Sequence, residues 1–133
     1  MNYFLDNNLS PRFEQVLRAL GVDVRHIANV DGLERDAPDT VWIPVVATNG
    51  WIAVGGDSKI LKRPAERACV ADHGLIYFVF DRSFPTREVW DQAEILIRAW
   101  PNIMAKAPGA RRGDCFVVKV PTGKVEFAER LGR

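Results

Sequence analysis

Apolar runs of strand length alternate with amphipathic segments of helix length along most of the chain. Strands are expected at residues 3–5, 22–27, 51–54 and 75–80. After the first of these, apolar residues at i, i+3, i+4 and i+7 predict a helix that starts at Ser10-Pro11 and ends at Gly21. The alternation predicts an α/β domain with a mostly parallel sheet, three layers deep, in which the first four strands take the order 2-1-3-4.

The middle of the chain contains prolines that set helix boundaries. Residues 29–38 are polar and predict a loop, after which Asp39 is expected to cap a helix that reaches about Thr48. Pro44 falls inside this helix, so the pattern predicts either a kink or a start near Trp42. A further helical stretch is expected from Ser58, with Pro64 as a new start or a break.

The last third predicts one long helix and a terminal hairpin. The helix is expected over residues 86–105, with Pro101 bending or interrupting it. Trp90 and Trp100 lie on this helix, and they are expected either in the core or on a surface for a partner or a second copy. Two short apolar runs, residues 115–120 and 125–127, flank a Pro-Thr-Gly-Lys turn and predict a C-terminal β-hairpin.

Length and charge narrow the functional classes. A chain of 133 residues is expected to form one domain spanning residues 1–133. Eighteen Lys and Arg against seventeen Asp and Glu give a net charge of +1, so nucleic-acid binding would have to rest on a local patch. Cys69 and Cys115 lie far apart and suggest neither a zinc site nor a disulfide framework. Without a signal-peptide pattern or a membrane-length apolar run, the protein is expected to be soluble and cytoplasmic.

Three of the apolar runs end at an aspartate, namely Asp6, Asp57 and Asp81. In a parallel sheet these residues emerge at one edge, and the order 2-1-3-4 places Asp6 beside Asp57 where the strand order reverses. Asp39, at the start of the helix before the third strand, is expected at the same edge. Grouped carboxylates are ligands suited to Mg²⁺ or Mn²⁺. Asp81 is instead expected to form a turn with Ser83, in contact with Arg82 or Arg87.

A structural interpretation competes with this one at each position. Aspartates at strand ends and helix starts commonly serve as turn and cap residues. His26 and His73 have no partner in the sequence and are expected to be structural or solvated. No nucleophile-elbow, Walker A or dinucleotide-binding pattern occurs, and Gly55-Gly56 is interpreted as a pair that lets the backbone turn sharply.

Five segments in order resemble PIN-like domains of the VapC toxin kind, covering roughly the first 80 residues. They are Phe4-Leu5-Asp6-Asn7-Asn8-Leu9-Ser10-Pro11-Arg12, Ala19-Leu20-Gly21 with Val22-Asp23-Val24-Arg25-His26, Asp36-Ala37-Pro38-Asp39-Thr40-Val41-Trp42-Ile43-Pro44, Gly50-Trp51-Ile52-Ala53-Val54-Gly55-Gly56-Asp57-Ser58-Lys59-Ile60 and Lys62-Arg63-Pro64-Ala65-Glu66-Arg67. The resemblance implies a ribonuclease that binds Mg²⁺ or Mn²⁺ through Asp6, Asp39 and Asp57, and it implies an antitoxin protein as partner. Asn8 takes the place of the small polar residue that follows the first Asp in the family.

The implied reaction is in-line attack of water on an RNA phosphodiester, with the divalent ion lowering the pKa of the water and neutralising phosphoryl charge. RNA phosphates would be positioned by a set of polar and basic residues near Asp57 and in a later loop. These residues are Ser58, Lys59, Lys62, Arg63, Arg67, Arg111 and Arg112. Asn8 is also expected to position the substrate. A solvated helix face is the alternative interpretation of the basic residues.

The sequence departs from the family pattern at Asn7, where relatives often have an acid, and at Gly55-Gly56, where they often have Thr or Lys. It also shows no certain equivalent of the fourth family acid. A PIN-like binding or assembly module without activity therefore stays open as the alternative. A receiver-like phosphoacceptor ranks below both, because no paired acids follow the first strand and no Lys ends the last one.

Overall fold

Six strands form one sheet in the computed structural model, which describes residues 1–132. The strands are β1 (Tyr3–Leu5), β2 (Val24–His26), β3 (Ile52–Gly55), β4 (Ile76–Phe80), β5 (Asp114–Val118) and β6 (Val125–Arg130). They lie in the order β2-β1-β3-β4-β5-β6, with the first five parallel and β6 antiparallel to β5. The predicted order 2-1-3-4 and the predicted C-terminal hairpin are both confirmed.

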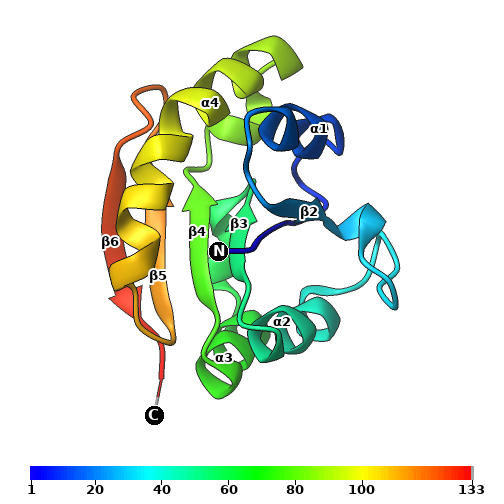
Figure 1. The fold of residues 1–133 in the computed structure, drawn as a ribbon. Helices are drawn as coiled ribbons and strands as arrows, with labels where there is room; N and C mark the ends of the chain where they lie inside the picture. Colours follow the sequence, from blue (N-terminus) through cyan, green and yellow to red (C-terminus); the bar gives the residue numbers. More distant parts are fainter. Residues whose placement is uncertain (133) are drawn as a thin grey trace.

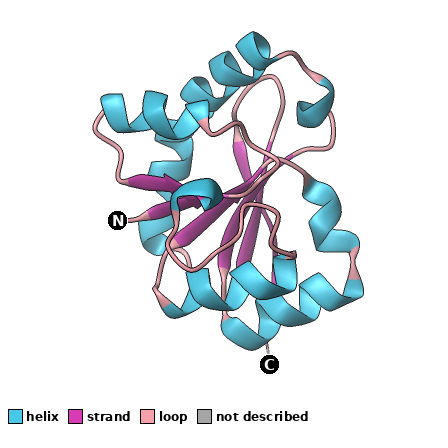
Figure 2. Cartoon of the chain, turned by 90° about the vertical axis from the view of Figure 1, so that its right-hand side faces the viewer, coloured by secondary structure: helices cyan, strands magenta, loops and turns pink. Residues whose placement is uncertain are grey.

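Helices cover both faces of this sheet, as Figure 1 shows, with α1 and α4 on one side and α2 and α3 on the other. Their bounds are α1 (Arg12–Ala19), α2 (Asp39–Thr48), α3 (Pro64–His73) and α4 (Val89–Lys106), with short 3₁₀ helices η1 (Ile27–Asn29), η2 (Ser58–Lys62), η3 (Phe84–Thr86) and η4 (Ala107–Gly109). In the rotated view of Figure 2 the strands run between helical layers. The predicted three-layer α/β/α architecture is therefore confirmed.

Alternation along the strands divides the core into two parts. Tyr3 and Leu5 belong to the apolar cluster beneath α1 and α4, whereas Phe4 belongs to the cluster beneath α2 and α3. All three side chains are buried, because successive residues of a strand point to opposite faces and both faces are covered. A continuous apolar run is thus what this sheet requires.

Two predicted boundaries differ in the structure. The long helix begins at Val89 because the preceding residues form η3, where Phe84 is buried and its ring stacks on Phe80 at 4.2 Å between centroids. Pro101 does not interrupt α4, which continues to Lys106.

Pro44 also fails to delay its helix, since α2 begins at Asp39 and not near Trp42. A proline has no N–H to donate to the carbonyl four residues earlier, here that of Thr40. The thiol of Cys69 on α3 lies 3.8 Å from this carbonyl oxygen. The neighbouring helix therefore supplies a weak donor where the helix itself has none.

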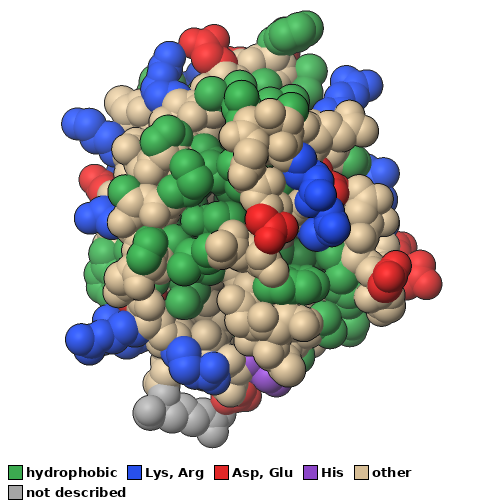
Figure 3. Space-filling model, viewed as in Figure 1, with side chains coloured by type: hydrophobic (Ala, Val, Ile, Leu, Met, Phe, Trp, Pro, Cys, Tyr) green, Lys and Arg blue, Asp and Glu red, His purple; other side chains and the backbone are tan. Residues whose placement is uncertain are grey.

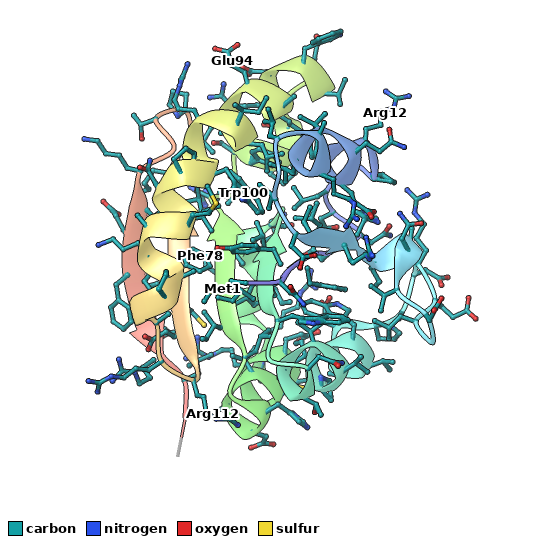
Figure 4. All side chains as sticks on the ribbon, viewed as in Figure 1. Met1, Arg12, Phe78, Glu94, Trp100 and Arg112 are labelled. Atoms are coloured by element: carbon teal, nitrogen blue, oxygen red, sulfur yellow. The ribbon has the colours of Figure 1, made fainter. Side chains whose placement is uncertain are left out.

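The two tryptophans of α4 have opposite surroundings. Trp100 is buried between the helix and the sheet, on the side where Phe78 also lies (Figure 4), whereas Trp90 is 85% exposed. Trp100 is thus a core residue, and only Trp90 is available at the surface. None of the described helices, α4 included, is both long enough and apolar enough to cross a membrane.

Candidate functional site

Asp6 lies at the point where the strand order reverses, directly after β1. Its N–H donates to the carbonyl of Val54 on β3, which continues the pairing of the two strands by one residue. The side chain is 3% exposed. Oδ1 accepts the N–H groups of Asn8 at 3.0 Å and Gly56 at 3.4 Å, and Oδ2 accepts the hydroxyl of Tyr77 at 3.1 Å.

Asp39 is the first residue of α2, and its carboxylate does not cap the helix as predicted. Pro38 occupies the N-cap position, and the helix start has no side-chain cap. Oδ1 of Asp39 instead accepts the indole N–H of Trp42 at 2.8 Å, while Oδ2 lies 3.9 Å from Nη1 of Arg63. The acid is still favourably placed, because a helix N-terminus carries partial positive charge.

Burial dominates the electrostatics of both acids. It raises the pKa of Asp6 to about 7, with a smaller repulsive contribution from Asp39, against the hydrogen bonds from Asn8, Gly56 and Tyr77. Burial likewise raises the pKa of Asp39. Asp6 is thus almost fully desolvated and Asp39 partly so, and a bound cation would offset the cost of charge on either acid.

Asp57 follows β3, the strand next to β1, and holds a different position. Its Oδ1 accepts the N–H of Lys59 at 2.9 Å and so caps η2. Across residues 1–132, no group of three or more His, Cys, Asp or Glu side chains lies close enough to hold a metal ion. The structure therefore gives Asp57 a capping role, while Asp6 experiences a small repulsion from Asp39.

The carboxylate oxygens of Asp6 and Asp39 nevertheless suit a hard cation. A carboxylate offers about four lone-pair positions, and Asp6 uses three of them. Within the described chain, Oδ2 of Asp39 and Oδ2 of Asp57 accept no hydrogen bond. Mg²⁺ keeps several waters and commonly takes only one or two protein carboxylates. Asp6 and Asp39 can meet that requirement, with Asp57 at the carboxyl end of the adjacent strand.

The basic stretch after Asp57 is exposed beside this pair. Lys59, Lys62 and Arg63 are solvent-accessible, and Arg63 reaches the carboxylate of Asp39. Ser58 opens η2 and is partly buried. These positions are compatible with contacts to a phosphate backbone.

Arg111 and Arg112 were predicted to contact phosphate but lie away from the acids, and Arg67 already forms other contacts. Arg112 precedes β5 and donates to the carbonyl of His73, which precedes β4. Residues 111–112 therefore lie at the amino ends of the strands, opposite the ends that carry Asp6 and Asp57. Figure 4 shows Arg112 beside the end of α3. Arg67 forms an ion pair with Glu129 on β6 and donates to the carbonyl of Leu61.

The polar residues after Asp6 contribute through different groups. Asn8 reaches the site through its backbone N–H, while its side chain is exposed. The side-chain oxygen of Asn7 accepts Nε of Arg35 at 3.0 Å. The amide of Asn7 thus binds a cationic side chain.

Gly55 and Gly56 are needed for space and not for a sharp turn, because neither has a positive φ. A Cβ on Gly55 would lie 2.6 Å from Oδ2 of Asp6 and 2.6 Å from the hydroxyl of Tyr77. A Cβ on Gly56 would lie 2.8 Å from the carbonyl oxygen of Asn8. The glycine pair therefore lets the end of β3 approach the Asp6 carboxylate closely.

Asp81 forms the predicted turn with Ser83, and His26 is buried and not solvated. Asp81 accepts the N–H and hydroxyl of Ser83 and the N–H of Val120, which joins the turn after β4 to the end of β5. The expected contact with Arg87 is wrong, because Arg87 pairs with Asp91 at 2.8 Å.

Sequence reasoning missed the two aromatic donors of the site. Tyr77 carries the polar side-chain atom within the apolar run at residues 75–80, and this was a signal that could have been used. Trp42 follows Asp39 by three residues, a spacing that brings side chains together on a helix. Trp42 was therefore predictable once the helix start was known.

Comparison with protein families gave one match. A family model described as "PIN like domain" matches residues 1–82, which include β1 to β4 and the three aspartates at positions 6, 39 and 57. No curated protein and no solved structure matched the chain.

Proposed function

This chain belongs to the PIN-like domain family, and we propose that it is a metal-dependent endoribonuclease. PIN-like domains are commonly nucleases, which supports hydrolysis of a phosphodiester as the reaction class. The observation that carries the proposal is the buried carboxylate of Asp6 at the switch point of the sheet, which the partly buried Asp39 repels. A desolvated carboxylate with a second acid near it is costly to a fold and is characteristic of a cation site.

The residues of this chain have separate roles in the proposed reaction. Asp6 and Asp39 would hold Mg²⁺ or Mn²⁺, with Asp57 as the third acid. When bound, the ion would supply positive charge for the phosphoryl oxygens and a lowered pKa for the attacking water. Lys59 and Lys62, together with Arg63, would hold the RNA through its phosphates and so fix the scissile bond against the acids.

The biological setting is proposed on narrower support. We propose that the protein is the toxin of a toxin–antitoxin pair, because its first 80 or so residues resemble the VapC kind in segment order and spacing. An antitoxin protein stays the predicted partner, and a homodimer stays a prediction as well.

A second candidate function is a PIN-like binding module without activity. It is favoured by the capping contact of Asp57 and by the absence of a three-residue ligand group within residues 1–132. In that case Asp6 would serve to close the loop after β1 through the N–H of Asn8.

Cleavage of a labelled single-stranded RNA in Mn²⁺ distinguishes the two. The wild-type protein should cleave, chelation should stop it, and Asp6→Asn should lower kcat/KM by about 100-fold or more, equal to about 2.7 kcal/mol of transition-state stabilisation. Asp23→Asn is the control, because Asp23 is exposed and lies at the amino end of β2, away from the strand ends that carry the acids. Cleavage that survives chelation would exclude the metal mechanism, and absence of both cleavage and Mn²⁺ binding would support the binding module.

A further inference from the structure

Tyr77 reaches the candidate metal site from an unexpected direction. It lies on β4, is fully buried, and packs in the apolar cluster under α2 and α3. Its hydroxyl nevertheless donates to Oδ2 of Asp6, which follows β1. Because β3 lies between β1 and β4, this hydrogen bond spans the end of an intervening strand.

β3 carries no side chain at the point where the hydrogen bond between Tyr77 and Asp6 crosses it. Gly55 is the last residue of β3, and any Cβ there would lie within 2.6 Å of both hydrogen-bonding oxygens. Since Gly55 has no positive φ, its backbone conformation does not require glycine. The missing side chain is therefore explained by the contact between Tyr77 and Asp6.

A second aromatic donor serves the other acid in the same way. Trp42 donates its indole N–H to Oδ1 of Asp39, and its ring meets that of Tyr77 edge-on, with 5.7 Å between centroids and 85° between planes. Two packed rings thus hold two carboxylates. Each ring is buried, so its hydrogen bond is held in a fixed geometry.

We propose that Tyr77 is a positioning residue of the metal site: through the gap at Gly55 its hydroxyl fixes the orientation in which the Asp6 carboxylate binds a divalent cation. This inference rests on the proposed function of the same site. The N–H groups of Asn8 and Gly56 bind Oδ1, whereas within residues 1–132 Tyr77 is the donor to Oδ2. Outer partners of metal-binding side chains typically contribute 10–100-fold to metal affinity or activity.

The test is Mn²⁺ affinity, measured by electron paramagnetic resonance of the free ion. Tyr77→Phe keeps the ring against Trp42 and removes only the hydroxyl, so it should weaken Mn²⁺ binding about 10–100-fold while the protein stays folded. Gly55→Ala places a methyl group on β3 against both oxygens of the same hydrogen bond, so it should weaken Mn²⁺ binding as well. Tyr3→Phe is the matched control, because Tyr3 is the other of the two tyrosines and is buried against Trp100 on the opposite face of the sheet. It should bind Mn²⁺ like the wild type.

A second readout does not depend on affinity. The tyrosine doublet in ultraviolet resonance Raman spectra reports hydrogen bonding of the phenol, so Mn²⁺ should change it in the wild type and in Tyr3→Phe but not in Tyr77→Phe. A structural hydroxyl remote from the ion would give no metal-dependent change in any of the three.

Asp6→Asn distinguishes a failure of the positioning role from a failure of the proposed function. If Asp6→Asn loses Mn²⁺ while Tyr77→Phe keeps the wild-type affinity, the positioning role is wrong and the proposed function stands. If Asp6→Asn binds Mn²⁺ as tightly as the wild type, the ion is not at this site, and both proposals are overturned.

Discussion

The carboxylate of Asp57 caps η2 and, under the proposed function, would also bind the metal ion. Its Oδ1 is bonded to the N–H of Lys59, and among residues 1–132 its Oδ2 accepts no hydrogen bond. One oxygen can therefore serve the cap while the other stays available. Asn is about as good a cap as Asp, because both offer a side-chain oxygen to the same N–H. The charge and the cap can thus be removed separately.

We expect Asp57→Ala to lower the free energy of unfolding by about 1 kcal/mol, the usual cost of a lost cap. Asp57→Asn should lie within about 0.5 kcal/mol of the wild type, since the oxygen acceptor is kept. Urea denaturation of both variants in chelator measures the difference. Under the proposed function both variants also lose RNA cleavage. Equal stability of the two variants would show that the bond to Lys59 contributes nothing.

At the scale of elements, β2 fixes the loop that carries Asp6. His26, the last residue of β2, is buried, and its Nε2 donates to the carbonyl of Leu9 at 2.7 Å. Its Nδ1 accepts the N–H of Ala28 at 3.1 Å, and this contact requires the neutral ring. Burial lowers the pKa of His26. The turn between β1 and α1 is therefore held by a neutral imidazole.

This arrangement predicts a pH-dependent stability. In the unfolded chain His26 is protonated near pH 6.5, while in the folded protein it resists protonation. The stability it contributes is therefore fully present above pH 6.5 and is lost as pH falls through the lowered folded pKa. The wild type should therefore lose more stability than His26→Gln between pH 7.5 and pH 5.

The measurement compares the two urea midpoints at each pH in chelator. The raised pKa of Asp6 gives a slope of the opposite sign between about pH 4 and 7, but both proteins contain it, so it cancels in the difference. His73→Gln, on partly exposed α3, is the control and should follow the wild type. Parallel pH profiles for wild type and His26→Gln would contradict the prediction.

At the scale of the whole molecule, charge is nearly balanced at +1. On the face shown in Figure 3 the Lys and Arg side chains are scattered among apolar and acidic ones. Arg67 and Arg112 are engaged in contacts away from the site. If the protein holds RNA, the exposed basic residues after Asp57 are the group best placed to do so.

Changing Lys59, Lys62 and Arg63 together to Ala should weaken RNA binding and flatten its salt dependence. Each lost phosphate contact lowers the slope by about 0.7 for a single strand, so three contacts lower it by about 2. Titration of labelled RNA at several salt concentrations gives the slope, with Asp6→Asn in every protein to prevent cleavage.

The matched control removes three positive charges near the amino ends of the strands, opposite the ends that carry the acids. Lys106, Arg111 and Arg112 are exposed there, at the end of α4 and before β5. Their replacement by Ala should leave the slope unchanged. If both triple variants reduce it equally, net charge and not a local phosphate path governs binding.

The sequence by itself determined the fold class, the order of the first four strands and the edge at which the acids lie. Apolar runs of strand length separated by helical stripes allow few arrangements, because parallel strands need right-handed helical connections. That constraint places Asp6 beside β3 without any knowledge of side-chain contacts. The prolines were less informative, since Pro44 and Pro101 both lie inside helices whose packing overrides the local preference.

Only the tertiary structure decided which side chains meet. Tyr77 and Asp6 are 71 positions apart, and their contact depends on β3 being the strand between them and on the space left at Gly55. The cap at Asp57 likewise depends on η2 turning its N–H groups toward the carboxylate. Periodicity specifies the face and the edge of a residue, whereas a hydrogen bond depends on ångström-scale distances that packing sets. For this reason the position of the acids in the sheet could be predicted, while the aromatic donors that contact them became evident only in the folded chain.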